Sequence, residues 1–469
     1  MTIWMVAKLI FYATLRAPMY RKRLVFSALA VFFFASTFVW AAPPKGSKGL
    51  VTKALEGQVV EFQLKNGMKW LLVPRKDSAP VFFGIVMIKT GGVDEAIGKT
   101  GVAHILEHLA FKGTKDISPK ELWDAFVTNG GADLNAYTTK DVTAYHASMP
   151  TAKLPLWMYL TSEMLQNSQL TEFDKEKEVV LEELVGKEEN TPERKMVQVL
   201  LDTAFDTSPY KWPTIGRKAD VENMTREDVA NFRKKYYSPE RMVGSLSGNF
   251  DVETAKALIQ EYFGDFQPAA TRQTRPPKEA AQDGTRRAEV VFNASPNIFI
   301  AYHKPTLPEF DDFAFDLISE ILCGGNDSVL RRELVYKRRL VSDVGCEPSF
   351  PGARFNNLFL IYAEPLKSSD YKKVEATIDV ELIRLAKDGP SAEALERARN
   401  SIIKTTVFDL AENDGMAQSL AYMQSVAGGW RYIIQQLKTY DAITPEDIAS
   451  VAGKYFTDNN KTVVTLVKK

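Results

Sequence analysis

Two histidines and a glutamate near residue 105 are spaced so that all three could act on one metal ion. The chain of 469 residues has four histidines, and two of them lie in the segment His104-Ile-Leu-Glu107-His108. On a helix, side chains four residues apart lie one above the other, so both imidazoles can reach the same ion. Glu107 lies on the adjoining edge of that face, within reach of a water on the metal. The spacing therefore predicts a zinc site with His104 and His108 as ligands and Glu107 as the general base.

The third ligand of this site must come from another segment, because a catalytic zinc usually has three protein ligands and one open position. The best source is an acidic stretch in which Glu176 and Glu183 share a partly apolar helix face with Val180, whereas Glu178 and Glu182 face away. A carboxylate on an apolar face needs a partner. We therefore predict that Glu183 is the third ligand and that Glu176 supports catalysis from a position beside the ligands.

Strand and helix signals around these residues predict a mixed unit of strands and helices. Asn66-Gly67 lies between two short segments, 61–64 and 69–73, and this pattern predicts a β-hairpin. Residues 267–287 are rich in Pro, Gln, Thr and charge, which is typical of a linker. Further patterns predict strands over 81–89, 132–138, 142–148 and 241–247, and helices over 100–112, 118–128, 153–205, 225–237 and 252–263. The fold class that follows is α+β.

The end of this unit recurs 219 residues later. The segment from Thr225 to Ser238 matches the segment from Thr444 to Thr457 without a gap. Each begins with a T-x-x-D capping signal, but capping alone does not explain the shared alanine, lysine and aromatic pair. Length alone suggests about three domains. The repeat instead predicts a catalytic domain over 50–266, the linker over 267–287 and a degenerate domain without metal over 288–469.

Charge is distributed unevenly along the chain. Lys+Arg and Asp+Glu each number 59, a balance that argues against nucleic acid as a partner because phosphate binding needs a basic surplus. Residues 1–41 contain five basic residues and no acid. The rest of the chain therefore has 54 basic and 59 acidic residues, a net charge of −5. The overall composition, with 45% hydrophobic and 25% charged residues, is typical of a globular protein.

Residues 1–41 have the pattern of an export signal. A basic cluster at 21–23 precedes an uncharged apolar run over 24–40, and Ala41 completes a V-x-A site. This pattern predicts a Sec-type signal peptide cleaved after Ala41, and hence a periplasmic or secreted protein. The alternative is an uncleaved anchor, because about 17 apolar residues lie at the lower limit for spanning a bilayer. Only in that case would the chain contact a membrane.

The chain has two cysteines, Cys323 and Cys346. In an oxidising compartment they could form a disulfide, but two cysteines do not make a disulfide framework. Unpaired burial is slightly favoured.

On these motifs the sequence resembles the pitrilysin or insulinase family of zinc metallopeptidases, which includes the mitochondrial processing peptidases. Its H-x-x-E-H order is the inverzincin pattern. The resemblance covers about residues 57–469 and is most specific in the first half. The residues that carry it are Gly91-Gly92-Val-Asp94-Glu95, Gly101 through Thr114, Asn135-Ala136-Tyr137-Thr138, Glu176 through Glu183, Pro209-Tyr210 and Gly216.

The resemblance implies two tandem α/β-sandwich domains, each with a mixed, largely antiparallel sheet packed with helices, that form a clam-like chamber. It implies one Zn²⁺ per chain, held by His104, His108 and Glu183. It also implies that a peptide binds as an added strand beside Asn135 and Ala136. In the family the motif glutamate is the general base, here Glu107. The ligands and this base are the same set that spacing and helix geometry predict above, whereas the peptide site and the chamber are implied by the resemblance alone.

The second half departs from the pattern of autonomous family members. Many of them carry an Arg and a Tyr seven residues apart, after a glycine-containing loop, to contact the substrate. Here Val335 and Ser342 stand at those two places. We therefore expect either a second family member that supplies the missing pair in a heterodimer or a homodimer.

Together these features predict an exported zinc-dependent endopeptidase that hydrolyses unstructured peptides by metal-activated water, alone or as one subunit of a heterodimer. The alternative from a different class is a noncatalytic binding or assembly subunit of a peptidase-like complex. Such subunits generally lose the zinc motif, which this chain retains.

Overall fold

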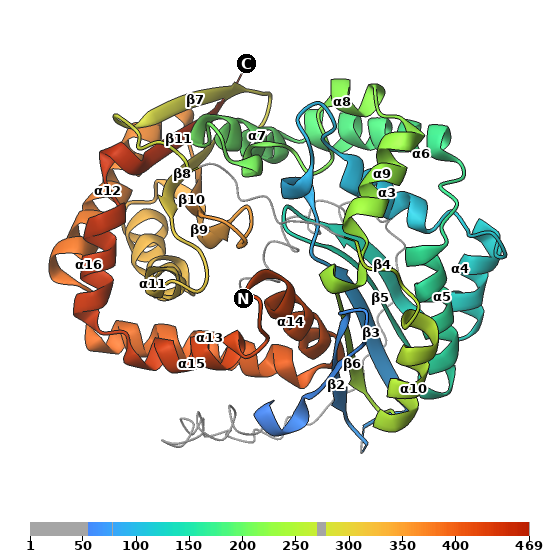
Figure 1. The fold of residues 1–469 in the computed structure, drawn as a ribbon. Helices are drawn as coiled ribbons and strands as arrows, with labels where there is room; N and C mark the ends of the chain where they lie inside the picture. The colour runs from blue at the N-terminus through green and yellow to red at the C-terminus, as the bar shows by residue number, and fades with distance from the viewer. Residues whose placement is uncertain (1–54, 77, 270–277, 469) are drawn as a thin grey trace, which may run out of the picture.

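The computed structural model describes residues 55–76, 78–269 and 278–468 (Figure 1). The expected signal peptide at 1–41 therefore lies outside the described residues, as does part of the expected linker. Within the described ranges, no helix is both long enough and apolar enough to cross a membrane.

The first half forms a six-stranded sheet with helices. Its bounds confirm the expected strands and most of the expected helices to within a few residues, but the helical stretch expected over 153–205 is divided into three helices, and the short helix Lys218–Glu222 was not expected. Its elements are β1 (Val60–Gln63), β2 (Lys69–Pro74), β3 (Val81–Ile88), α3 (Val102–Ala110), α4 (Pro119–Thr128), β4 (Ala132–Thr138), β5 (Thr143–Pro150), α5 (Leu154–Gln166), α6 (Phe173–Glu183), α7 (Pro192–Ala204), α8 (Lys218–Glu222), α9 (Arg226–Tyr236), β6 (Met242–Gly248) and α10 (Val252–Phe263).

The second half forms a five-stranded sheet with helices. Its elements are β7 (Arg286–Val291), β8 (Asn297–Lys304), α11 (Phe310–Cys323), β9 (Val341–Phe350), β10 (Asn357–Pro365), α12 (Tyr371–Asp388), α13 (Ala392–Ala411), α14 (Asn413–Val426), α15 (Tyr432–Ala442), α16 (Pro445–Tyr455) and β11 (Lys461–Val467). Strand β7 begins inside the last residues of the segment expected to be a linker.

The two sheets have the same topology apart from one extra strand. Their orders are β1-β2-β6-β3-β5-β4 and β7-β11-β8-β10-β9. In each sheet the last strand in sequence lies between a parallel and an antiparallel neighbour, β6 between β2 and β3, and β11 between β7 and β8. The other pairs are antiparallel. The expected fold class, two related α+β units with mixed and largely antiparallel sheets, is therefore confirmed.

The 219-residue repeat is present in the structure without a shift. Helix α9 spans 226–236 and α16 spans 445–455, and the strands that follow them begin at 242 and 461. Thr225 and Thr444 each cap their helix through the backbone N–H group three residues later, and Asp228 and Asp447 return the bond to the capping residue. The capping box thus fixes both helix starts in the same way.

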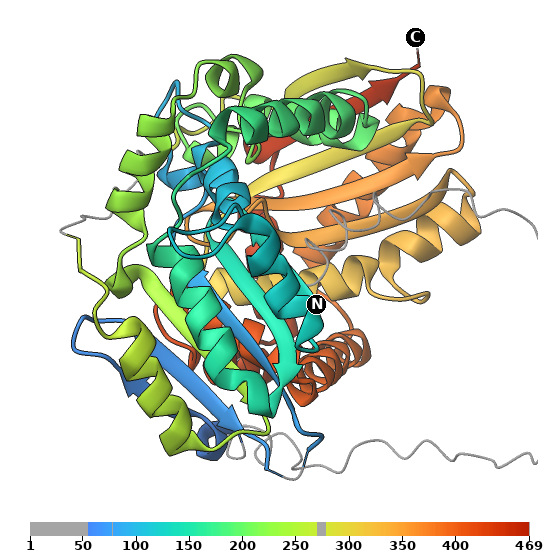
Figure 2. The ribbon, with the colours of Figure 1, turned by 90° about the vertical axis from the view of Figure 1, so that its right-hand side faces the viewer.

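The two halves exchange helices. Helix α14 of the second half covers the first sheet, where Met416 and Leu420 pack against Phe83 and Met87. Helix α7 of the first half lies across the second sheet, where Leu200 packs in a cluster with strand residues of β8, β10 and β11 (Figure 2). Burying each such side chain contributes about 1.5–3 kcal/mol. Each sheet therefore needs the other half to cover one of its faces.

The expectation that the two cysteines are unpaired is wrong. Cys323 at the end of α11 and Cys346 on β9 form a disulfide, with their Cα atoms 5.7 Å apart. Helix α11 packs directly on β9, so residues that are 23 positions apart in sequence meet in the core. This tertiary contact has no signal in the local sequence.

A cavity of about 1110 Å³ lies in the second half, between the end of α11 and helices α12 and α13. The clam-like chamber between the halves stays a prediction.

Candidate metal centre

Helix α3 carries the H-x-x-E-H segment and is fixed at its start by a buried carboxylate. Glu95 accepts hydrogen bonds from the backbone N–H groups of Gly101 and Ala103, both at 2.9 Å. A carboxylate at a helix N-terminus satisfies N–H groups that have no partner within the helix. Burial raises the pKa of Glu95 to about 8, although both hydrogen bonds act in the opposite direction. Gly101 adopts a positive φ of 91° directly against the Ile215 carbonyl, where no other residue would fit.

The structure brings the three expected ligands together. The ligand atoms of His104, His108 and Glu183 lie within 4.8 Å of one another, and this is the one such group among the described residues. Glu183 Oε2 is 4.0 Å from His104 Nε2 and 3.7 Å from His108 Nε2. Tetrahedral ligands about 2.1 Å from a zinc ion are roughly 3.4 Å apart. The two imidazoles and one carboxylate therefore fit zinc in both chemistry and separation.

Glu176 lies beside the ligands, as expected, and its exposed neighbours Glu178 and Glu182 face away. Its buried carboxylate is 3.4 Å from His108 Nδ1, the ring nitrogen opposite the one that faces Glu183. A carboxylate in this position fixes the orientation and tautomer of a metal-binding histidine. Lys112 pairs with the other oxygen of Glu176 at 2.7 Å, so the carboxylate is held from two sides. The sequence did not single out Lys112.

Glu107 is buried in the wall of the site and points toward β4. Its Oε2 accepts a hydrogen bond from the Thr138 hydroxyl at 2.9 Å. Burial raises the pKa of Glu107 to about 7, and the nearby Glu183 carboxylate raises it further against the effect of Thr138. A carboxyl group with a pKa near neutrality can both accept and deliver a proton. Thr138 was noticed in the motif, but its contact with Glu107 was not foreseen.

The expected peptide-binding residues lie on the edge strand of the first sheet, beside α3. Strand β4 pairs with β5 on one side, and a register shift separates Ala132 from Asn135. The Asn135 side chain accepts a hydrogen bond from the Ala136 N–H at 2.9 Å. Because β4 is last in the strand order, its outer edge can pair with an added strand.

The described part of the second half holds no comparable ligand group. Val335 lies in a short π-helix, Arg331–Lys337, and Ser342 is exposed on β9, where its hydroxyl donates to Glu364. Neither position offers a guanidinium or a phenol.

Two family models match the chain. The model described as insulinase, peptidase family M16, matches residues 74–218, which include α3 and α6. The model described as the peptidase M16 inactive domain matches residues 223–402.

Relatives and solved structures agree with these matches. The chain is 29% identical to the zinc protease PqqE of Helicobacter pylori over 421 residues, 86% of this chain and 91% of that protein. The crystal structure of a protease from Helicobacter pylori has a TM-score of 0.82 at 27% identity, and the match covers 87% of this chain and 99% of that one. The periplasmic protease PqqL from Escherichia coli shares the fold, with a TM-score of 0.73 at 19% identity over 87% of this chain and 47% of that one.

The fold and these matches define a peptidase built from two related α+β halves. The chain belongs to the insulinase family of peptidases, family M16.

Proposed function

We propose that the chain is an exported zinc-dependent endopeptidase that hydrolyses unstructured peptides. It would hold one Zn²⁺ through His104, His108 and Glu183. The observation that carries the proposal is the convergence of these three side chains beside a buried glutamate. The zinc protease relatives support the reaction class.

The residues of the site have separate roles in this proposal. A bound zinc ion would polarise the scissile carbonyl and lower the pKa of a water molecule. Glu107 accepts the proton that the attacking water loses and delivers it to the leaving amine. Thr138 orients Glu107, and Glu176 with Lys112 orients His108. The outer edge of β4 at Asn135 and Ala136 holds the peptide through backbone hydrogen bonds.

Export and a partner subunit are further parts of the proposal. The signal-like segment at 1–41 supports export, and the periplasmic location in the name of the Escherichia coli structure agrees with it. Val335 and Ser342 leave the second half without the substrate-contacting Arg and Tyr, which a second family member would supply. If the purified chain alone is fully active and no partner changes its activity, the heterodimer is contradicted.

One observation favours a second candidate, a noncatalytic binding or assembly subunit. The model that matches residues 223–402 is described as an inactive domain. In that case the chain would bind peptides without cleaving them, with or without a partner.

The test compares wild type with Glu107→Gln, each purified with zinc and incubated with an unstructured peptide. Glu107→Gln should keep its zinc and hydrolyse the peptide about 10²- to 10⁴-fold more slowly. Glu182→Gln, on the exposed face of α6, is the matched control and should behave as wild type. A zinc-loaded Glu107→Gln protein that cleaves normally would contradict the role of Glu107. A wild type that binds zinc but cleaves nothing, even after co-purification with its native partners, would favour the noncatalytic candidate.

A further inference from the structure

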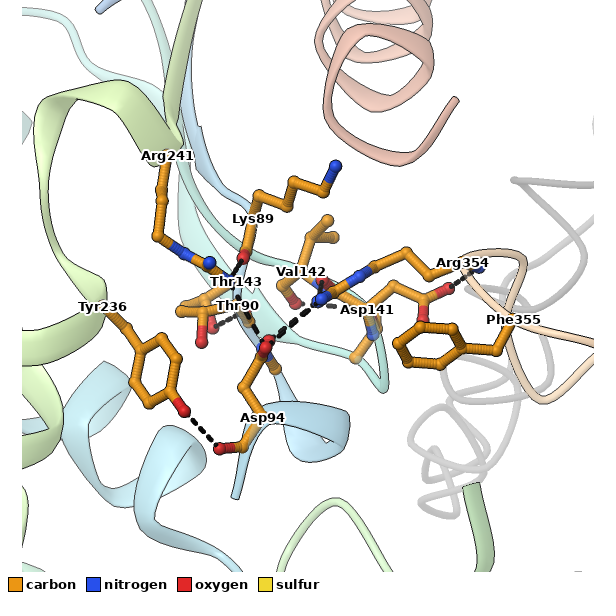
Figure 3. A network of polar contacts seen from close by, with 12 residues as sticks. Lys89, Thr90, Asp94, Asp141, Val142, Thr143, Tyr236, Arg241, Arg354 and Phe355 are labelled. Carbon is orange, nitrogen blue, oxygen red and sulfur yellow. Dashed lines mark hydrogen bonds and ion pairs between the residues drawn. The ribbon is translucent and has the colours of Figure 1, made fainter. Parts of the chain in front are cut away.

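We infer that Arg354 of the second half is a positioning residue for the metal centre of the first half. The inference rests on the proposed function and adds the part played by the half without metal. Arg354 lies in the loop between β9 and β10, and this loop reaches the first half (Figure 3). There it holds two segments. One runs along the chain to the start of the H-x-x-E-H helix, and the other directly follows Thr138, which binds Glu107 of that helix.

The first segment contains Asp94. Arg354 forms a two-point ion pair with it, with Nη1 at 2.7 Å from Oδ2 and Nη2 at 3.2 Å from Oδ1. The side chain of Arg354 is 3% exposed and that of Asp94 is 10% exposed, so water screens the pair little. Arg241 also contacts Asp94, at 3.3 Å. The next residue is Glu95, which caps α3 through Gly101 and Ala103.

The second segment is the turn between β4 and β5. Asp141 in this turn accepts hydrogen bonds from the backbone N–H groups of Ala353 and Arg354, at 2.6 and 3.2 Å. The Arg354 side chain donates to the Asp141 carbonyl at 3.0 Å. Gly352 lies so close to the Asp141 carboxylate that a Cβ atom would approach within 2.5 Å. The turn follows Thr138, whose hydroxyl binds Glu107.

The two segments are also bound to each other. The N–H groups of Gly92 and Val93 donate to the carbonyls of Thr139 and Lys140, at 3.1 and 2.9 Å. Arg354 therefore binds both of two segments that are also bound to each other. One of them holds the start of α3, and the other follows Thr138, which binds Glu107. Without the guanidinium, the Asp94 carboxylate loses its two-point ion pair and the Asp141 carbonyl loses its donor, so both segments lose their common support.

A different arginine at the boundary of the halves provides a matched control. Arg286 on β7 donates to the carbonyls of Thr203 and Ala204 at the end of α7, at 3.0 and 3.1 Å, and pairs with Asp206 at 2.6 Å. It joins the halves as Arg354 does, but its own hydrogen bonds and ion pair go to the end of α7 and not to the two segments that Arg354 holds. Arg286→Ala therefore reports the cost of weakening the boundary alone.

The first measurement is hydrogen exchange on the metal-free full chain. In Arg354→Ala, the amides of Gly101 to Ala103 and of residues 139–142 should exchange about tenfold faster than in wild type. In Arg286→Ala they should not change. Equal exchange at these amides in both variants would overturn the inference, and this readout does not depend on whether the protein is a peptidase.

The second measurement is the kinetics of the zinc-loaded chain with its native partner, if one co-purifies. Arg354→Ala should lower kcat about 10- to 100-fold with KM within about threefold, because a misplaced base slows the chemical step more than it weakens binding. Arg354→Lys should recover part of kcat, since it restores the charge but not the fork. An unchanged kcat in Arg354→Ala, or a loss equal to that in Arg286→Ala, would overturn the inference.

If wild type cleaves nothing, the proposed function fails, and the exchange data still decide the inference about Arg354. If Arg354→Ala does not fold, Arg354→Lys and Asp94→Asn take its place in both measurements, with the same expected directions and the same contradicting results.

Discussion

The two halves share one topology, but each has a helix with a pair of ionisable side chains, and the groups that contact these two pairs differ. Helix α3, which follows β3, presents His104 and His108 to Glu183 from α6. Helix α11, which follows β8 in the same order, carries Asp312 and Asp316 with the same four-residue spacing. The four-residue spacing is equal in both halves, but the residue types of the two pairs and the groups around them differ.

In the second half, groups of the chain itself compensate the acids. The buried Lys304 ammonium contacts Asp312, and the Tyr440 hydroxyl and the Gln436 amide donate to Asp316. Burial and the Asp312 charge raise the pKa of Asp316 to about 6. In the first half, the two histidines face Glu183, the third ligand of the proposed zinc site. The difference indicates that the four-residue spacing alone does not make a metal centre, and that the proposed centre also needs the carboxylate from α6.

Loss of this third ligand should have the largest effect. Glu183→Gln should remove zinc and abolish peptide hydrolysis, because two imidazoles alone hold the ion poorly. Metal analysis and a peptide assay on the same sample check this. Glu182→Gln is the control on the exposed side of the same helix. Full zinc content in Glu183→Gln would show that the ligand comes from elsewhere.

Loss of the carboxylate that supports His108 should have an intermediate effect. Glu176→Gln should lower zinc affinity or activity about 10- to 100-fold, because the imidazole keeps its place but loses its ionic partner. A competition titration with a zinc chelator measures the affinity. Wild-type affinity together with wild-type kinetics would mean that Glu176 serves only to bind Lys112.

Each half should contribute to the pH dependence of stability through one buried acid, and zinc should change only the contribution of the first half. The pKa of Glu107 is raised in the folded chain, so the folded state holds a proton that the unfolded chain has already released between about pH 4.5 and 7. The stability of the metal-free protein should therefore fall as pH rises through this range, by on the order of 3 kcal/mol from this group. Zinc should remove the fall, because a cation favours the ionised carboxylate.

Thermal melts of wild type and Glu107→Gln, with and without zinc, measure this contribution. The glutamine variant has no proton to lose, so its stability should depend less on pH. Equal pH dependence in the two metal-free proteins would show that Glu107 ionises normally.

The smallest effect on activity is expected in the second half. Asp316→Asn should leave peptide hydrolysis within about twofold of wild type, because Asp316 has no role in the proposed chemistry. Because the pKa of Asp316 is raised in the folded chain, the stability of wild type should fall as pH rises from about 4 to 6, and Asp316→Asn should remove this fall. Zinc should not alter it. A loss of activity comparable to that of Glu176→Gln would mean that the second half takes part in the chemistry directly.

Features with a local cause could be predicted from the sequence. The β1–β2 hairpin follows from Asn66-Gly67, and α9 and α16 follow from their T-x-x-D caps. The grouping of His104, His108 and Glu183 could also be anticipated, because two ligands are neighbours on one helix turn and the third occupies the apolar face of another helix.

Features that depend on tertiary packing could not be predicted. Helical periodicity predicts α7 but does not say that it covers the sheet of the other half. The Cys323–Cys346 disulfide depends on α11 packing on β9. Arg354 and Asp94 are 260 residues apart, and neither has a local pattern that marks it as half of a pair.

The central claim is that one of two related halves holds the metal. The most direct test is anomalous diffraction at the zinc edge from crystals grown with zinc. We expect one strong peak per chain, between His104 Nε2, His108 Nε2 and the Glu183 carboxylate, and none beside Asp312 and Asp316. No peak at the first position, or a peak of equal height in the second half, would contradict the account.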